Sequence, residues 1–169
     1  MTVKRASASK RDTRRAAHQR ALRLVPANGQ LDDLVENVAA ATGRPVSLLA
    51  FALGRGEPTG LWIATDVANY VVYPEAASAA ERTAIVCHEL AHILLDHEPQ
   101  GEAARLAELA ATVAPNISPA VARRMLARHG YGEGVEAEAE DLATRLVTRL
   151  ASCGERDRIT QDTISSRLR

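Results

Sequence analysis

Aromatic residues are scarce in this chain: one Trp, three Tyr and one Phe make up 3% of its 169 residues. Any core must therefore be aliphatic, and an apolar content of 46% is enough to build one domain. The two cysteines, Cys87 and Cys153, are too few for a disulfide framework. No apolar run approaches the length of a membrane span, and the N-terminus lacks the apolar stretch of a signal peptide. We expect a soluble, cytoplasmic protein with no membrane partner.

The chain also lacks net charge, but its charges are unevenly spread. Residues 1–30 hold eight Lys or Arg against one Asp, a net charge of +7, so the remainder carries −7. We interpret residues 1–30 as a basic arm, either disordered or helical, before a core domain over 31–153 and a polar tail over 154–169. Such an arm can bind nucleic acid or an acidic partner. Without aromatic residues for stacking or a known reading module, however, a solvated tail or helix is favoured over direct DNA binding.

One segment of the core domain has the marks of a helix with a defined start. Apolar residues at positions 85, 86, 90, 93 and 94 follow helical periodicity. Ser78 followed by Glu81 is a capping-box signature. These two signals predict a helix from about Ala79 to about Leu95.

The residues from His88 to His92 within this helix read H-E-L-A-H, an H-E-x-x-H motif. Residues four apart share a face of a helix, so His88 and His92 can both bind one metal ion. Glu89 then lies beside the metal, where it can take a proton from water and pass it to a leaving amine. The alternative is a surface helix with solvated histidines, which the apolar neighbours disfavour because they would bury those rings without partners.

A catalytic zinc site needs a third protein ligand, with the fourth position left to water. Glu98 lies where some zinc peptidases have a third His, but Leu95 replaces the glycine of their turn, so we discount it. His97 lies close to the end of the helix, and its alternative is a solvated loop residue. His129 is predicted to end a separate helix, where the dipole favours a cation.

An acidic cluster supplies the fourth candidate. Glu136, Glu138, Glu140 and Asp141 lead into an apolar pattern at positions 139, 142, 143, 146, 147 and 150, which is again helical. Glu138 shares the apolar stripe, and a buried carboxylate needs a partner that a metal can supply. The helix dipole explains the other acids better. The prediction is one zinc ion per chain, held by His88, His92 and Glu138, although manganese or iron could use the same ligands.

The two motifs together, H-E-L-A-H-I-L-L-D-H at 88–97 and E-A-E-A-E-D-L-A-T-R-L at 136–146, resemble those of the ImmA/IrrE family of metallo-endopeptidases. The resemblance covers about residues 31–150. It implies that His88 and His92 bind zinc, that Glu89 is the catalytic acid and base, and that Glu138 is the third ligand. It also implies cleavage of a regulatory protein such as a helix-turn-helix repressor, in response to stress or DNA damage.

The chain departs from this family pattern in several places. Leu142 replaces the usual Phe of the second motif, and the stretch between the motifs is longer than in compact members. No helix-turn-helix domain is recognisable in the given sequence before the core. These departures affect the predicted substrate and regulation more than the predicted chemistry. A second hypothesis stays open beside the peptidase, in which the protein is a non-proteolytic zinc-binding regulator or a toxin–antitoxin component that acts by binding a partner or DNA.

The rest of the core is predicted to form short helices and strands around the H-E-x-x-H helix. The pattern indicates a helix over 31–42 ended by Gly43, strands over 45–51, 61–65 and 69–73, a helix over 118–129 and a flexible link over 130–134. We therefore predict an α+β fold, mainly helical, with a small antiparallel three-stranded sheet packed beside the H-E-x-x-H helix.

Substrate contacts are harder to predict. In similar zinc peptidases an edge strand beside the metal helix binds the substrate as an added strand, and we expect this of the third strand, Tyr70, Val71, Val72 and Tyr73. The oxyanion of the tetrahedral intermediate needs a donor beside the metal, for which His129, Tyr131 and His97 are the candidates.

Overall fold

The computed structural model describes residues 10–52, 60–64, 67–97 and 132–167, and its fold is α+β and mainly helical. In chain order the elements are α1 (Lys10–Leu22), α2 (Leu31–Thr42), β1 (Val46–Phe51), β2 (Leu61–Ala64), β3 (Asn69–Pro74), α3 (Ala79–Leu94) and α6 (Glu133–Arg167). The predicted fold class is confirmed, and the predicted bounds of α2 and of the strands agree to within a residue or so. The helix predicted over 118–129 lies outside the described residues.

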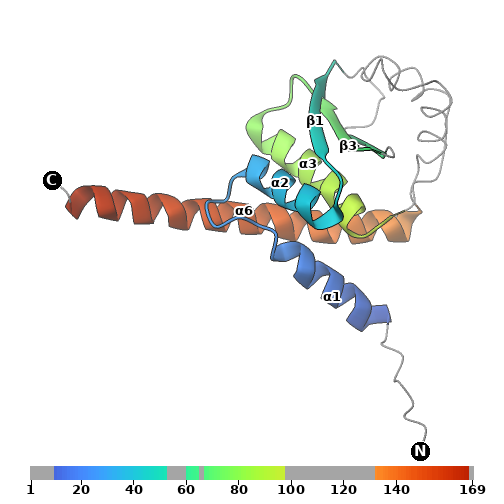
Figure 1. The fold of residues 1–169 in the computed structure, drawn as a ribbon, viewed down its shortest axis with the longest axis horizontal. Helices are drawn as coiled ribbons and strands as arrows, with labels where there is room; N and C mark the ends of the chain where they lie inside the picture. Colours follow the sequence, from blue (N-terminus) through green and yellow to red (C-terminus); the bar gives the residue numbers. More distant parts are fainter. Residues whose placement is uncertain (1–9, 53–59, 65–66, 98–131, 168–169) are drawn as a thin grey trace, which may run out of the picture.

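The central helix α3 lies between the sheet and α6, with α2 packed beside it and α1 against α6 (Figure 1). A single aliphatic core joins these layers. Val71 from the sheet, Leu90 from α3 and Leu142 from α6 all belong to it and are 0% exposed. Because α3 is buried on both sides, the apolar neighbours of its two histidines hold their rings inside the molecule.

The sheet is mixed, which corrects the prediction of an antiparallel one. Its strand order is β1-β3-β2, in which β1 pairs with β3 in parallel and β2 pairs with β3 in antiparallel. After β1 the chain forms β2 at the other edge of the sheet, and β3 then lies between these two strands. As a result β3 runs parallel to β1 and antiparallel to β2. Strand composition predicts that strands exist but carries no information on their order, since both pairings suit alternating apolar residues.

This order also overturns the predicted substrate strand. Residues Tyr70 to Tyr73 belong to β3, whose backbone is paired on one side with β1 and on the other with β2. A central strand has no free row of N–H and C=O groups with which to bind an added strand. Among the described strands, the free edges belong to β1 and β2.

The start of α3 is fixed by a capping box, as predicted. The backbone N–H of Glu81 donates to the Ser78 hydroxyl at 3.3 Å, and the Glu81 carboxylate accepts from the Ser78 backbone N–H at 2.8 Å. The Ser78 hydroxyl also donates to the Glu81 carboxylate at 2.6 Å, and this bond, together with the one from the Ser78 backbone N–H, lowers the pKa of Glu81. The cap defines the first turn of the helix that carries both histidines.

Replacing Ser78 with Ala is expected to lower the free energy of unfolding by about 1 kcal/mol, the usual cost of losing a serine cap. Ser78→Gly should cost only a few tenths of that, because glycine is itself tolerated at this position. Urea denaturation of both variants measures the difference. A cost for Ser78→Ala no larger than that for Ser78→Gly would mean that the cap contributes nothing.

Helix α6 is longer than predicted at both ends. It begins at Glu133, inside the predicted flexible link, and continues without a break through Gly154 to Arg167, so the predicted polar tail is helical as far as residue 167. Its C-terminal part extends beyond the rest of the fold (Figure 1). No helix in the described part of the chain is both long enough and apolar enough to cross a membrane.

The described part of the basic arm consists of the helix α1 and the turn that follows it. The helix packs on α6 through a buried pair, His18 and Ala21, exposed by 6% and 3%. His18 Nδ1 lies 3.6 Å from the Asp141 carboxylate, and its buried Nε2 has no hydrogen-bond partner among the described residues. Burial lowers the pKa of His18, opposed by Asp141 and Glu138 and reinforced by Arg14 and Arg145. The folded protein therefore holds this ring neutral.

Acidification is expected to weaken this contact. Because the folded pKa of His18 lies below its unfolded value of about 6.5, the unfolded chain binds more protons in the window between the two, and stability falls as the pH falls below about 6.5. Thermal melts of wild type and His18→Gln from pH 7.5 to 5.5 measure this effect. The wild type should lose more stability over this range than the variant, which has no titrating ring. His97 also has a lowered pKa, but it is present in both proteins, so it does not contribute to the difference between them. If the stability of wild type and of the variant changed equally with pH, the role given to His18 would be wrong.

Candidate metal site

The two histidines of the H-E-x-x-H motif converge on one point. His88 and His92 lie one turn apart in the second half of α3, and their Nε2 atoms are 3.1 Å from each other. The His92 ring is 1% exposed and the His88 ring 27%, so the pair lies at the edge of the core rather than on the open surface. This spacing confirms that both rings are on the same face of the helix.

A carboxylate from α6 completes the group. Glu136, in the first turn of α6, places Oε2 at 3.4 Å from His88 Nε2 and 3.8 Å from His92 Nε2. Within the described residues these three side chains form a group that could hold a metal ion. Glu136 follows His92 by 44 residues in the sequence. The packing of α6 across α3 brings the glutamate to the two histidines.

The geometry and the donor set both fit a first-row metal such as zinc. Bonds of about 2.0–2.1 Å in a tetrahedral site put ligand atoms roughly 3.3 Å apart, close to the three distances found here. Two imidazole nitrogens and one carboxylate oxygen are a usual set for a site that keeps an open fourth position.

Each imidazole also has a partner at its other nitrogen. His88 Nδ1 lies 3.4 Å from Glu140 Oε2, and His92 Nδ1 lies 3.0 Å from His97 Nδ1. His97 reaches this position because Asp96 adopts a left-handed φ of 53° after α3, and the His97 backbone N–H then donates to the His92 carbonyl oxygen. Partners of this kind fix the tautomer and orientation of a ligand ring.

Glu89 lies beside these three side chains but is not one of the group that could hold a metal ion. It is 7% exposed, and its carboxylate accepts a hydrogen bond from the Trp62 backbone N–H on β2. Burial, reinforced by the nearby charge of Glu136, raises the pKa of Glu89 to about 8, and the Trp62 hydrogen bond opposes the rise. A cation bound at the histidines would lower this pKa again.

Two features shape the space around Glu89. Gly60 packs so closely on it that an added Cβ would lie 2.9 Å from Glu89 Oε1 and 2.5 Å from Ile85 Cγ2. A cavity of about 250 Å³ is lined by His88 and Glu89 together with Ala84, Ile85 and Glu140. The Glu89 carboxylate and the His88 ring therefore border the same open space.

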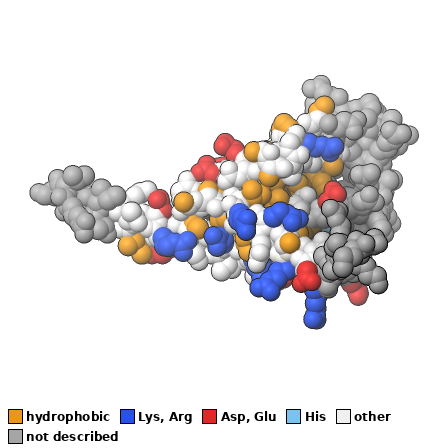
Figure 2. Space-filling model, turned by 60° about the horizontal axis from the view of Figure 1, so that its bottom comes forward, with side chains coloured by type: hydrophobic (Ala, Val, Ile, Leu, Met, Phe, Trp, Pro, Cys, Tyr) orange, Lys and Arg blue, Asp and Glu red, His pale blue; other side chains and the backbone are white. Residues whose placement is uncertain are grey.

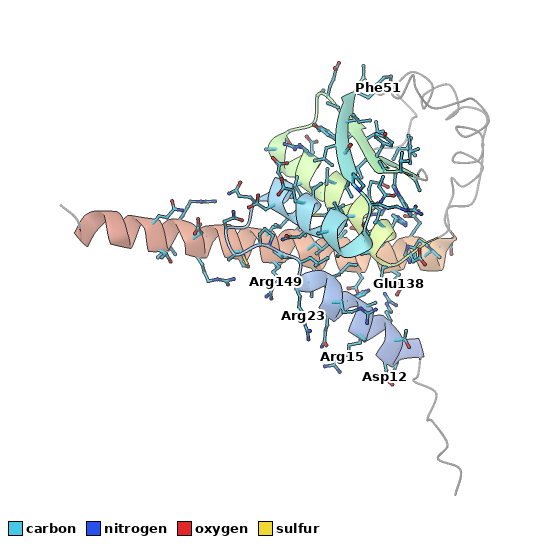
Figure 3. The ribbon with its side chains drawn as sticks, in the orientation of Figure 1. Asp12, Arg15, Arg23, Phe51, Glu138 and Arg149 are labelled. Carbon is cyan, nitrogen blue, oxygen red and sulfur yellow. The ribbon has the colours of Figure 1, made fainter. Side chains whose placement is uncertain are left out.

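The structure brings Glu136 to the histidines where the sequence predicted Glu138. Glu138 instead lies on the side of α6 that faces α1, where Arg14 Nε is 3.1 Å from its carboxylate (Figure 3). Residues two apart on a helix point about 200° away from each other, so the two glutamates flank the apolar stripe on opposite sides. The apolar stripe of α6 does not by itself show whether the side with Glu136 or the side with Glu138 faces α3. Glu136 and Glu140 are four residues apart, so they share the flank of α6 that contacts His88. This spacing is the signal in the sequence for that flank, although acids in a first helical turn are also explained by the helix dipole.

The other predicted site residues divide into two groups. His129 and Tyr131, the candidate oxyanion donors, and Glu98 lie outside the described residues. His97 lies behind the His92 ring and does not line the cavity beside Glu89, which suits a positioning role better than that of an oxyanion donor. Cys87 is fully buried, as predicted for a core residue, and burial raises its pKa to about 12.

Comparison of the chain with models of protein families, with curated proteins and with solved structures finds no match.

Proposed function

We propose that this protein is a zinc-dependent endopeptidase. The observation that carries the proposal is the convergence of His88 Nε2, His92 Nε2 and Glu136 Oε2 at 3.1–3.8 Å from one another, with a buried carboxylate, Glu89, beside them. Zinc bound by such a set supplies Lewis-acid polarisation of a carbonyl group and makes water more acidic. The resemblance to the ImmA/IrrE motifs supports the same chemistry.

In this mechanism the protein's own groups carry the proton and hold the geometry. Glu89 takes a proton from the attacking water and returns it to the leaving amine, a role that suits a carboxylate with access to the cavity it shares with His88. The Trp62 N–H and Gly60 limit the movement of that carboxylate. Glu140 and His97 orient the two imidazoles.

The strand β2 is the place where we expect an extended substrate to bind. Among the described strands it pairs only with β3, and its Trp62 contacts Glu89 directly. A peptide added along the outer edge of β2 would therefore pass beside the carboxylate. From the resemblance we propose a regulatory protein, such as a helix-turn-helix repressor, as the substrate class. The cytoplasm is the proposed compartment, since Cys87 and Cys153 are both free.

Incubation of the zinc-loaded protein with a proteome-derived peptide library, followed by mass spectrometry of new N-termini, tests the activity. We expect new termini with wild type that are absent after chelation. A protein that binds zinc at full stoichiometry but generates no termini from any peptide would instead be the non-proteolytic regulator of the second hypothesis.

A further inference from the structure

The positive charge of the N-terminal arm does not stand alone in the folded protein. The contact between α1 and α6 joins it to arginines that lie more than one hundred residues later in the sequence, and Figure 2 shows Lys and Arg side chains gathered over these two helices. We define the basic face by five exposed arginines: Arg15 and Arg23 from α1 and the turn after it, and Arg145, Arg149 and Arg156 from α6.

A groove marks the line where the two helices meet. It has a volume of about 400 Å³ and is lined by Leu22 at the end of α1 and by one stripe of α6, namely Thr144, Arg145, Thr148, Arg149, Ser152 and Arg156. Arg145, Arg149 and Arg156 follow helical spacing, so their Cα atoms span about 16 Å along the axis of α6. The basic face is therefore a row along a helix with a shallow depression beside it.

Most of this charge is not neutralised within the molecule. Arg15, Arg23 and Arg149 take part in none of the ion pairs found among the described residues. Arg156 donates to Cys153 Sγ, which leaves its charge unpaired, whereas Arg145 lies 3.1 Å from the Asp141 carboxylate. Four guanidinium groups thus remain available to a partner, in a chain whose formal net charge is zero.

We propose that the basic face binds the sugar–phosphate backbone of double-stranded DNA without reading its sequence. Duplex DNA presents one negative charge per about 1.7 Å of axis, so a row of about 16 Å meets close to ten phosphate charges. Every described cation of the face is an arginine, whose planar fork fits a phosphate with two hydrogen bonds. The absence of aromatic side chains from the face argues against single strands, which bind largely by stacking.

Two other polyanions fit less well. Binding to a bilayer needs an apolar stripe beside the charges. Among the described residues of α1 and α6 the only large apolar side chain that is exposed is Ile159, one turn beyond Arg156. An acidic protein surface seldom presents negative charge over the full length of such a row, as a phosphate backbone does.

The test is fluorescence anisotropy with the full-length protein and two unrelated 20-base-pair duplexes at 50–200 mM salt. With about four phosphates neutralised, the logarithm of the association constant should fall against the logarithm of salt concentration with a slope of about −3.6. Affinity should drop on the order of 100-fold over this range, equally for both duplexes.

Variants of the basic face make the test specific. Arg149→Gln should reduce the magnitude of the slope by about one, and Arg23→Gln with Arg149→Gln by about two. Arg44→Gln, the same change of charge at the turn between α2 and β1, should leave the slope unchanged. Because these side chains are exposed, circular dichroism should show unaltered folding.

Several results would overturn the proposal. These are no binding of either duplex at 50 mM salt, equal slopes for wild type and the double variant, or a strong preference for one duplex sequence. Tighter binding of phosphatidylserine vesicles than of DNA through the same arginines would assign the face to a membrane instead.

Discussion

Replacement of Glu89 with Gln is expected to reduce the peptidase activity by about 10²–10⁴-fold, the usual contribution of a general base, while the bound metal is retained. Glutamine preserves the shape of the side chain and can still accept the Trp62 N–H, but it cannot take a proton from water. Because Glu89 lies outside the group of ligand atoms, its loss removes no ligand. The ratio of kcat values on a peptide identified in the library, with metal content measured on the same samples, checks both statements.

Glu36→Gln is the matched control, since it makes the same chemical change on an exposed residue of α2 and should leave activity intact. If Glu89→Gln cleaves the peptide at the wild-type rate, another group is the base. If it loses its metal together with its activity, Glu89 is a ligand and the geometry described above is incorrect.

Replacement of Gly29 with Ala is expected to lower the free energy of unfolding by roughly 2–5 kcal/mol. Gly29 has a left-handed φ of 69°, which an alanine adopts at a cost. A Cβ there would also overlap backbone atoms of α6, the nitrogen of Gly154 and the carbonyl oxygen of Leu150, and backbone atoms cannot move aside as the end of a side chain can. The turn between α1 and α2 would have to separate from α6.

Gly154→Ala is the matched control on the opposite side of the same contact. A Cβ at position 154 would lie 3.5 Å from the Asn28 carbonyl oxygen, which is an ordinary contact. Since Gly154 is inside a helix, alanine there should stabilise the protein by about 0.5–1 kcal/mol. Urea denaturation of both variants measures the pair. Equal effects of the two substitutions, or a stable Gly29→Ala, would show that this turn does not pack on α6 as described.

The local elements of this fold were predictable because their signals are local. Ser78 and Glu81 form the capping box that their spacing predicted, and Gly43 ends α2 with a φ of 69°. The shared face of His88 and His92 follows from helix geometry alone. In each case the interacting residues are at most four positions apart, so no knowledge of the tertiary fold was needed.

What could not be predicted depended on packing between distant segments. The pairing of β1 with β3 requires a crossover that the strand sequences do not specify. The choice between Glu136 and Glu138 depends on which flank of α6 faces α3, and the other flank is occupied by Arg14 of α1. Arg14 lies more than 120 residues before Glu138 in the sequence, so no local pattern indicates that the two side chains form an ion pair.

The metal content of the protein tests most directly whether His88, His92 and Glu136 form a metal site. Elemental analysis and zinc titration would compare wild type with Glu136→Gln and Glu138→Gln, two identical changes on opposite flanks of α6. We expect one zinc per chain in wild type and in Glu138→Gln. Affinity should fall by more than about 100-fold in Glu136→Gln, because the loss of an outer-shell partner alone costs about 10–100-fold. A wild type that binds no metal, or a Glu138→Gln that loses zinc while Glu136→Gln retains it, would contradict this account.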